Sequence, residues 1–305
     1  MGRQQFLAVL MKTIPQYPDS IAINLGLRPV LHPLLKKLSH GISEFTFANL
    51  YLFRDRHGYK VSRVGSDVVQ GGEPSMVIIG EDGGKPFFML PFAIPEKETL
   101  DLLFENHRQL KCVSTVQADY FVRGGYTVVE DRDNFDYLYL QEKLANLGGR
   151  KYHKKRNLIK AFVRDYEYEG RPLLDEYIPH ALEVLEQWRE NRDDDADYLP
   201  AKEALELCSP LQLCGGIYYV DGRPVAYSLG EENAGGTSFV VHFEKAVPGY
   251  KGLWQFVNQA FASILTEHYT TVNREQDLGN EGLRKAKMSY QPHDFVKKYR
   301  VVSGQ

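Results

Sequence analysis

Hydrophobic residues recur at helical spacing in several segments of the chain. In the segment 253–268 they fall at positions i, i+3, i+4 and i+7, which is the spacing of one buried helix face. These residues are Leu253, Phe256, Val257, Ala260, Phe261, Ile264 and Leu265. The segments 96–110 and 172–191 predict two more helices, and a further helix, interrupted by two prolines, is predicted within 20–40.

Short apolar segments bounded by turn residues predict the strands. In the first half of the chain these segments are 45–53, 59–64, 76–80, 86–91, 112–116, 126–130 and 135–140. In the second half they are 217–220, 225–229, 237–243, 270–274 and 295–302. Two glycine-containing turns, 81–84 and 221–224, each join neighbouring strands and predict β-hairpins.

The order of these elements predicts the fold. The second half runs helix, hairpin, strand, glycine loop, helix, strand, helix, strand, which is the order of the GNAT acyltransferase fold, a mixed sheet with helices on both faces. The first half shows the same order more faintly. The sequence therefore predicts an α/β (α+β) protein with two GNAT-like folds in tandem. The predicted domains are 1–140 and 166–305, joined by a basic helix over 141–165.

Composition and charge narrow the class of protein. The 305 residues are 43% hydrophobic and 25% charged, which is a normal soluble balance for about two domains. A net charge of −3 excludes a protein that is basic throughout, so nucleic-acid binding requires a local patch. Three scattered cysteines predict neither a disulfide framework nor a metal site. No apolar run approaches the roughly 20 residues of a transmembrane segment, so a cytoplasmic protein is expected.

A local basic patch lies in the predicted connecting helix. Five cations surround His153, namely Arg150, Lys151, Lys154, Lys155 and Arg156. Cations at spacings of three and four repel one another on a helix unless an anion neutralises them. The segment therefore predicts a docking surface for RNA phosphates or anionic lipid headgroups. The alternative is a solvated connector between the domains.

Residues 273–292 place acids, cations and a tyrosine on a turn that leads into a short helix. A helix that begins near Asn280 places one set of side chains on its inward face, with Lys285 opposite and Arg284 and Met288 beside it. The inward set is Leu283, Ala286, Lys287 and Tyr290. A buried ammonium needs an anionic partner, for which Asp277, Glu281 or a substrate are the candidates. The alternative is a lysine that reaches solvent.

Several segments carry a resemblance to a known family. The string GLRKAKMSYQP at 282–292 and the segment Asp294-Phe-Val-Lys-Lys-Tyr299 resemble the C-terminal signature of the phosphatidylglycerol lysyltransferase C-terminal domain family. Segments 44–53 and 149–158 fit the same resemblance, which thus spans nearly the whole chain. It implies two GNAT folds joined by a basic helix, and transfer of an amino acid from aminoacyl-tRNA to a lipid. The motif positions that it carries over are Asp277, Gly282, Leu283, Arg284, Lys287, Tyr290 and Pro292.

Aminoacyl transfer needs a base for the acceptor and donors for the tetrahedral oxyanion. Asp277 and Glu275 are candidates for the base. Arg284 and Lys287 are candidates to hold the oxyanion or the terminal phosphate of tRNA, and Tyr290 to protonate the leaving ribose oxygen. His242, on a predicted strand, is interpreted as a core or cleft histidine.

The loop 247–252 corresponds to the loop that binds a pyrophosphate in GNAT enzymes. Gly249, Lys251 and Gly252 are therefore candidate anion-binding residues. Lys251 stands where the coenzyme A signature has a small residue, so acetyl-coenzyme A is expected to bind poorly. The alternative is a glycine turn that only begins a buried helix.

Three functions fit these observations. The first is an aminoacyl-tRNA-dependent aminoacyltransferase, acting without a cofactor on a lipid headgroup or a small amine or hydroxyl acceptor, with peripheral membrane contact. The second is a coenzyme A-dependent N-acyltransferase, and the third is a non-catalytic tandem GNAT binding module. The basic helix and the altered glycine loop favour the first over the second. The charges of the segment 273–292 disfavour the third.

Overall fold

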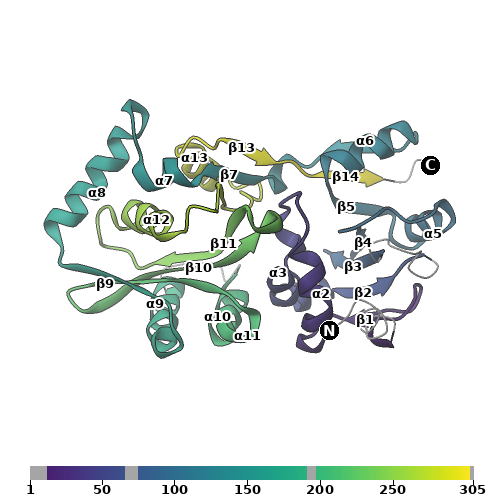
Figure 1. Ribbon diagram of the computed structural model, residues 1–305, viewed down its shortest axis with the longest axis horizontal. Coiled ribbons are helices and arrows are strands. Elements are labelled where there is room, and N and C mark those ends of the chain that lie inside the picture. Colours follow the sequence, from purple (N-terminus) through teal and green to yellow (C-terminus); the bar gives the residue numbers. More distant parts are fainter. Residues whose placement is uncertain (1–11, 66–74, 191–196, 303–305) are drawn as a thin grey trace. The chain divides into compact units, whose positions relative to one another are not determined.

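The computed structural model describes residues 12–65, 75–190 and 197–302 (Figure 1). The chain forms two compact units. Unit 1 comprises residues 1–135 and 296–305, and unit 2 comprises residues 136–295. Each unit is built on one seven-stranded mixed sheet flanked by helices.

The sheet of unit 1 has the strand order β1-β2-β3-β4-β5-β14-β6. Its strands are β1 (Ile21–Ala22), β2 (Lys60–Arg63), β3 (Met76–Asp82), β4 (Lys85–Met89), β5 (Gln109–Val113), β6 (Thr127–Glu130) and β14 (Tyr299–Val302). Its helices are α2 (Arg28–Leu35), α3 (Phe47–Leu52), α4 (Arg54–His57), α5 (Lys97–His107) and α6 (Thr115–Arg123), with short 3-10 turns at Leu25–Leu27, Ser43–Phe45 and Arg132–Asn134. Apolar side chains of α5 and α6 pack with those of β3, β4, β5 and β14 in one core.

The sheet of unit 2 has the strand order β13-β7-β12-β11-β10-β9-β8. Its strands are β7 (Asp136–Leu140), β8 (Tyr168–Pro172), β9 (Cys214–Val220), β10 (Arg223–Asn233), β11 (Ser238–Ala246), β12 (Thr271–Asn273) and β13 (Asp294–Val296). Its helices are α7 (Gln141–Asn146), α8 (His153–Asp165), α9 (Ile178–Glu190), α10 (Tyr198–Glu206), α11 (Cys208–Leu211), α12 (Leu253–Ile264) and α13 (Glu281–Met288), with 3-10 turns at Arg150–Tyr152, Asp175–Tyr177 and Ala234–Gly236. Figure 1 shows α9 and α10 on one face of this sheet and α8 and α12 on the other.

The two sheets share one plan. In each, an antiparallel meander is followed by a parallel strand that is reached through a helix, α5 in unit 1 and α12 in unit 2. A strand from elsewhere in the chain then pairs antiparallel with that parallel strand: β14 beside β5, and β7 beside β12. The compact units therefore differ from the predicted ranges, because β7 joins the second sheet and β14 the first. A strand's own residues do not specify which sheet it will join, since either edge offers the same hydrogen-bonding groups.

Most predicted elements are present, and two predicted strands are wrong. The segment 45–53 is not a strand but a 3-10 turn followed by α3, which begins at Thr46, whose side chain accepts a hydrogen bond from the Asn49 amide. Every residue of α3 is buried, including Asn49, so the segment lacks the exposed polar face that reveals helical periodicity. The predicted strand 295–302 is divided between β13 and β14, in different sheets.

A further helix, α6, follows β5 and was not predicted from the sequence. Its start carries a capping box in which the Ser114 hydroxyl accepts from the Gln117 amide and the Gln117 side chain accepts from the Ser114 amide. The Ser-x-x-Gln spacing that builds this cap was visible in the sequence. The helices α10 and α11 were missed as well.

The basic helix α8 packs within unit 2, across the start of α12. The rings of Phe162 and Phe256 stack with centroids 4.7 Å apart. Gly252 caps α12 with a left-handed φ of 88°, and a Cβ added there would lie 2.3 Å from the carbonyl oxygen of Leu158 in α8. Only glycine allows the two helices to approach this closely.

We predict that Gly252→Ala lowers the free energy of unfolding by about 1–3 kcal/mol more than Gly249→Ala, because only the first substitution adds a steric clash. Gly249 has a similar left-handed φ of 100°, but its added Cβ meets no atom within 4 Å. Chemical denaturation of both variants measures the difference. Equal losses would show that α8 does not press on Gly252.

Candidate functional site

The sheet of unit 2 opens between β11 and β12. These strands pair through three residue pairs only, from Ser238 with Thr271 to Val240 with Asn273. After Asn273 the chain no longer pairs with β11. It continues to pair with β7, where the Arg274 amide donates to the Tyr137 carbonyl at 3.0 Å. β11 continues alone on this side to Ala246. Polar side chains of β11 and of the chain after β12 occupy the opening.

Two polar contacts bridge the opening. His242 Nδ1 lies 2.8 Å from Glu275 Oε1, and Arg274 Nη2 lies 2.6 Å from Glu244 Oε1. On β11, Phe243 pairs with Leu229 and Val241 with Gly230, so His242 is the extra residue of a β-bulge and the regular alternation of faces is interrupted there. Glu275, directly after Arg274, has a left-handed φ of 52°, and both side chains reach β11. Such a conformation costs about 1–2 kcal/mol in a residue with a side chain, so the surrounding contacts must hold it.

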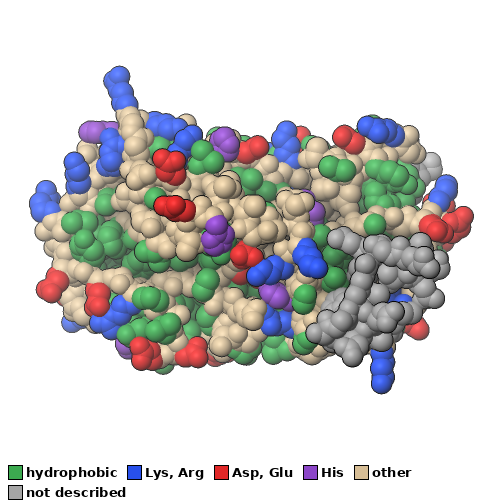
Figure 2. Space-filling view, viewed as in Figure 1, with side chains coloured by type: hydrophobic (Ala, Val, Ile, Leu, Met, Phe, Trp, Pro, Cys, Tyr) green, Lys and Arg blue, Asp and Glu red, His purple; other side chains and the backbone are tan. Residues whose placement is uncertain are grey.

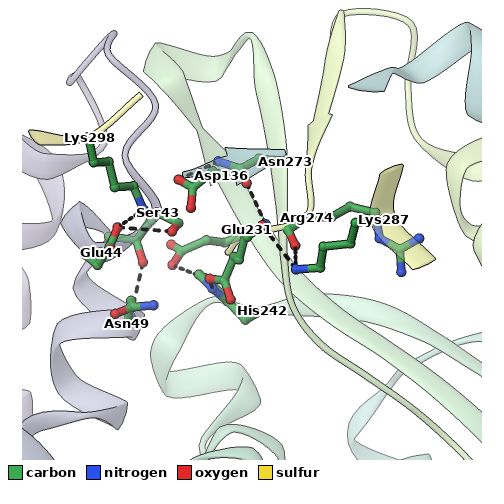
Figure 3. Close-up of polar contacts among 12 residues, drawn as sticks. Ser43, Glu44, Asn49, Asp136, Glu231, His242, Asn273, Arg274, Lys287 and Lys298 are labelled. Carbon is green, nitrogen blue, oxygen red and sulfur yellow. Dashed lines mark hydrogen bonds and ion pairs between the residues drawn. The ribbon is translucent and has the colours of Figure 1, made fainter. Parts of the chain in front are cut away.

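The imidazole of His242 is clamped between two carboxylates (Figure 3). Its Nε2 lies 3.1 Å from Glu231 Oε1, opposite the contact with Glu275. Burial lowers the pKa of His242, but the two carboxylates outweigh it and raise the pKa to about 10. At neutral pH the ring is an imidazolium that donates to both acids. Within the part of the chain that the structure describes, no group of three or more His, Cys, Asp or Glu side chains is arranged to hold a metal ion.

Asp277 anchors the turn that follows Glu275. Its carboxylate, fully buried, accepts hydrogen bonds from the Tyr137 hydroxyl at 2.5 Å, from the Gly279 amide at 2.9 Å and from Arg284 through Nε and Nη2 at 2.9 and 2.7 Å. Burial raises the pKa of Asp277, but Arg284, Tyr137 and Gly279 outweigh it and lower the pKa to about 2. Two carboxylate oxygens offer about four lone-pair positions. Asp277 is therefore engaged as an anchor, and Arg284 is its bidentate partner.

Lys287 holds the loop 274–276. Its Nζ donates to the carbonyl oxygens of Arg274 at 2.7 Å, of Glu275 at 3.1 Å and of Gln276. An ammonium has three donors, and all three are used on the backbone, so Lys287 does not pair with Asp277. Burial lowers the pKa of Lys287 to about 8, with Glu275 opposing and Arg274 reinforcing the shift. Figure 3 shows the lysine reaching the backbone at Arg274.

The inward face of α13 differs from the prediction. The helix begins after Asn280, whose side chain accepts from the Leu283 amide, as the sequence predicts. Lys287 and Tyr290 point inward, but Leu283 and Ala286 are exposed. The hydrogen bonds to the preceding loop and to Asp277 turn the polar side of the helix inward, so they override its apolar pattern.

A second polar group lies beside Arg274. Lys155 of α8 lies 3.4 Å from the ring centroid of Tyr290 and donates to Ser289 Oγ at 2.8 Å. Burial and the nearby charge of Arg274 lower the pKa of Lys155 to about 8. Burial raises the pKa of Tyr290 to about 12, so the phenol keeps its proton at neutral pH.

The five predicted cations of the basic segment divide by role. Arg156 donates to the carbonyl oxygens of Leu147 and Gly149 and so closes the end of α7. Lys155 points inward. The exposed cations are Arg150, Lys151 and Lys154. Figure 2 shows blue Lys and Arg side chains around the end of unit 2 that carries α8.

The three residues of the predicted anion site at the glycine loop also differ in their exposure to solvent. Gly249 and Lys251 are exposed, whereas Gly252 is buried beneath α8. The backbone of α8 thus packs directly against Gly252, the residue before α12. The structure does not present the three residues as one open surface.

Unit 1 contains a separate buried ion pair. Lys298 is fully buried and donates to Glu44, which also accepts from the Ser43 hydroxyl at 3.3 Å (Figure 3). This pair could not be predicted from the sequence, because Glu44 lies 254 positions from Lys298. In unit 2 the missed residues are Glu231, Glu244 and Arg274. For Glu244 a signal existed, since His242 and Glu244 alternate with apolar residues on a strand.

Comparisons with known proteins agree with this geometry. Residues 35–302 match the family described as phosphatidylglycerol lysyltransferase, C-terminal. A conserved protein of unknown function from Bacteroides thetaiotaomicron is 29% identical, with a TM-score of 0.82 over 94% of this chain and 99% of that one. An uncharacterized protein of Mycoplasmoides gallisepticum is 25% identical over 222 residues, 66% of this chain and 70% of that protein.

More distant solved structures share the fold. L-PGS from Bacillus licheniformis has a TM-score of 0.55 at 14% identity, over 82% of this chain and 89% of that one. FemX has a TM-score of 0.56 at 11% identity, over 93% and 97%. The predicted fold class, two GNAT-like folds in tandem with mixed sheets flanked by helices, is confirmed. Among the described residues, no helix is long and apolar enough to cross a membrane.

We predict that His242 remains an imidazolium at pH 8. Its folded-state pKa of about 10 lies above the unfolded value of about 6.5, so its contribution to stability is complete below pH 6.5 and is lost as the pH rises through 10. Heteronuclear NMR of the ring nitrogens, assigned by the signal that His242→Gln removes, measures the charge. A neutral ring at pH 8 would contradict the double carboxylate clamp.

We also predict that Lys287→Met lowers the free energy of unfolding by about 1–3 kcal/mol, because it leaves three backbone carbonyls without their donor. Lys285→Met is the matched control, since Lys285 lies exposed on the same helix, and its effect should stay within about 0.5 kcal/mol. Urea denaturation compares the two. If both variants unfold alike, Lys287 does not hold the loop.

Proposed function

Because the chain belongs to the phosphatidylglycerol lysyltransferase C-terminal family, we propose that it is an aminoacyltransferase. It moves an amino acid from aminoacyl-tRNA to a hydroxyl or amine of a lipid headgroup or of a small molecule. The observation that carries this proposal is the opening between β11 and β12, where Glu231, His242 and Glu275 lie beside the pair of Arg274 and Glu244. The fold shared with L-PGS and FemX supports it.

We assign the general base to Glu275. Of the two carboxylates that hold His242 it is the more accessible, with 17% of its side chain exposed against 6% for Glu231. Its Oε1 lies 2.8 Å from Nδ1 of the imidazolium. Asp277, the other candidate, already accepts four hydrogen bonds. Glu275 takes the proton of the acceptor hydroxyl or amine as that atom attacks the ester carbonyl.

The remaining roles follow from the donors that the site offers. Arg274, whose guanidinium has five donors, is the proposed stabiliser of the oxyanion, because Arg284 is engaged with Asp277 and Lys287 with the backbone. Tyr290, protonated at neutral pH, gives its proton to the ribose oxygen as the ester bond breaks. Arg284 and Lys287 are positioning residues in this scheme.

We propose aminoacyl-tRNA rather than coenzyme A as the donor, and no cofactor. The start of α12, where GNAT enzymes bind a pyrophosphate, is packed against the backbone of α8 at Gly252. The exposed cations of the basic segment offer a surface for tRNA phosphates instead. We place the reaction in the cytoplasm, where aminoacyl-tRNA is formed, with peripheral membrane contact if the acceptor is a lipid.

The test is transfer of radiolabel from a total pool of charged tRNA to a cell lipid extract or a mixture of small amines and alcohols. Glu275→Gln should slow transfer roughly 10²–10⁴-fold, the usual contribution of a general base. Glu281→Gln, an exposed glutamate of α13, is the control and should transfer at the wild-type rate. Added acetyl-coenzyme A should have no effect. No transfer to any acceptor, or full activity of Glu275→Gln, would reject the proposal.

A further inference from the structure

An unpartnered hydroxyl lies under the candidate site. Tyr218 of β9 is 4% exposed, and among the described residues its buried hydroxyl has no hydrogen-bond partner. The hydroxyl lies 3.1 Å from the position that a Cβ on Gly216 would take, so the tyrosine extends over that glycine. Leaving a buried hydroxyl unpaired costs about 1–3 kcal/mol. A bound group that accepts its hydrogen bond would remove this cost.

The hydroxyl lies over Gly216, at one end of a row of paired positions that leads to Glu244. Gly216 pairs with Ser228 across β9 and β10, and Ser228 pairs with Glu244 across β10 and β11, so the three positions form one row. Burial raises the pKa of Tyr218, and the nearby charge of Glu244 raises it further. Glu244 in turn holds Arg274 at 2.6 Å. Tyr218 and Arg274 therefore both lie near Glu244.

Two cations meet there. Lys155 enters from α8 and donates to Ser289, two positions after Lys287, whose ammonium bonds the Arg274 carbonyl. Burial and the nearby charge of Arg274 lower the pKa of Lys155. Glu244 is the carboxylate that bonds Arg274, so these three side chains together carry one excess positive charge. Tyr290, beneath Lys155, lies close enough for Arg274 and Glu244 to affect its pKa. Like charges in a largely buried place are costly unless an anion joins them.

We infer that Tyr218, Lys155 and Arg274 bind a phosphodiester near the 3′ end of the donor RNA. This inference rests on the proposed function and names a binding site for its substrate. A phosphate offers several acceptor oxygens and a negative charge, which match one phenol hydroxyl and two cations. RNA is favoured over a single lipid headgroup because the exposed Arg150, Lys151 and Lys154 lie just before Lys155, where further phosphates of one strand can bind.

The experiment measures binding of a fluorescent single-stranded RNA, 5′-ACCA-3′, by anisotropy. Tyr218→Phe, which removes only the hydroxyl, should weaken binding roughly tenfold, as should Lys155→Gln, because each loses a hydrogen bond to a charged group. Tyr227→Phe is the matched control. Tyr227 also carries a buried hydroxyl without a partner among the described residues, but it lies near Asp197. Its variant should bind as the wild type does.

Competition and transfer assays separate the outcomes. Inorganic phosphate should displace the RNA from the wild type and compete less well with Tyr218→Phe. Unchanged RNA binding by Tyr218→Phe, or an equal loss in Tyr227→Phe, would overturn the inference. Displacement by glycerophosphoglycerol at concentrations where phosphate has no effect would also overturn it, since the occupant would then be a lipid headgroup.

The phosphate site and the proposed transfer reaction can be tested separately. Wild-type transfer together with unaltered RNA binding by Tyr218→Phe would remove this site and leave the aminoacyltransferase intact. Selective loss of RNA binding in Tyr218→Phe without any transfer by the wild type would support the phosphate site and reject the reaction.

Discussion

The candidate site depends on the way one buried lysine holds three consecutive carbonyl oxygens. Lys287 bonds the backbone of residues 274–276, and the Asp277–Arg284 pair fixes the turn that follows. Together they stabilise the left-handed conformation of Glu275. From this turn Arg274 reaches Glu244, and Glu275 reaches His242. Asp277, Arg284 and Lys287, which the sequence predicted as catalytic residues, thus position Arg274 and Glu275.

The opening itself comes from a change of partner strand. β12 leaves β11 after three residue pairs because the chain beyond it continues to pair with β7. β7 follows unit 1 in the chain and inserts beside β12, so this distant segment creates the gap in which His242 and Glu244 meet Arg274 and Glu275. The charges across the gap alternate in sign, which keeps four ionised side chains compatible with burial.

The contact between α8 and the start of α12 favours aminoacyl-tRNA over coenzyme A as the proposed donor. In a coenzyme A enzyme of this fold the start of the helix after the fourth strand must be open to an anion. Here α8 packs against Gly252, the residue directly before that helix, and glycine at this position permits the contact. The same helix carries Lys155 to Tyr290 and leaves three cations exposed. One basic helix therefore both closes the site of one donor and offers a surface to another, which is the physical basis for proposing RNA.

The sequence by itself determined the local elements and the family. Periodicity identified α5, α9 and α12, the Asn280 cap placed the start of α13, and the signature at 282–292 indicated the family that residues 35–302 match. Those features depend on neighbouring residues. Only the tertiary structure decided that β7 and β14 join different sheets, that Lys287 bonds backbone rather than Asp277, and that His242 lies between Glu231 and Glu275. These contacts join positions far apart in the chain, and hydrogen-bond partners of that kind leave no periodic trace in a single sequence.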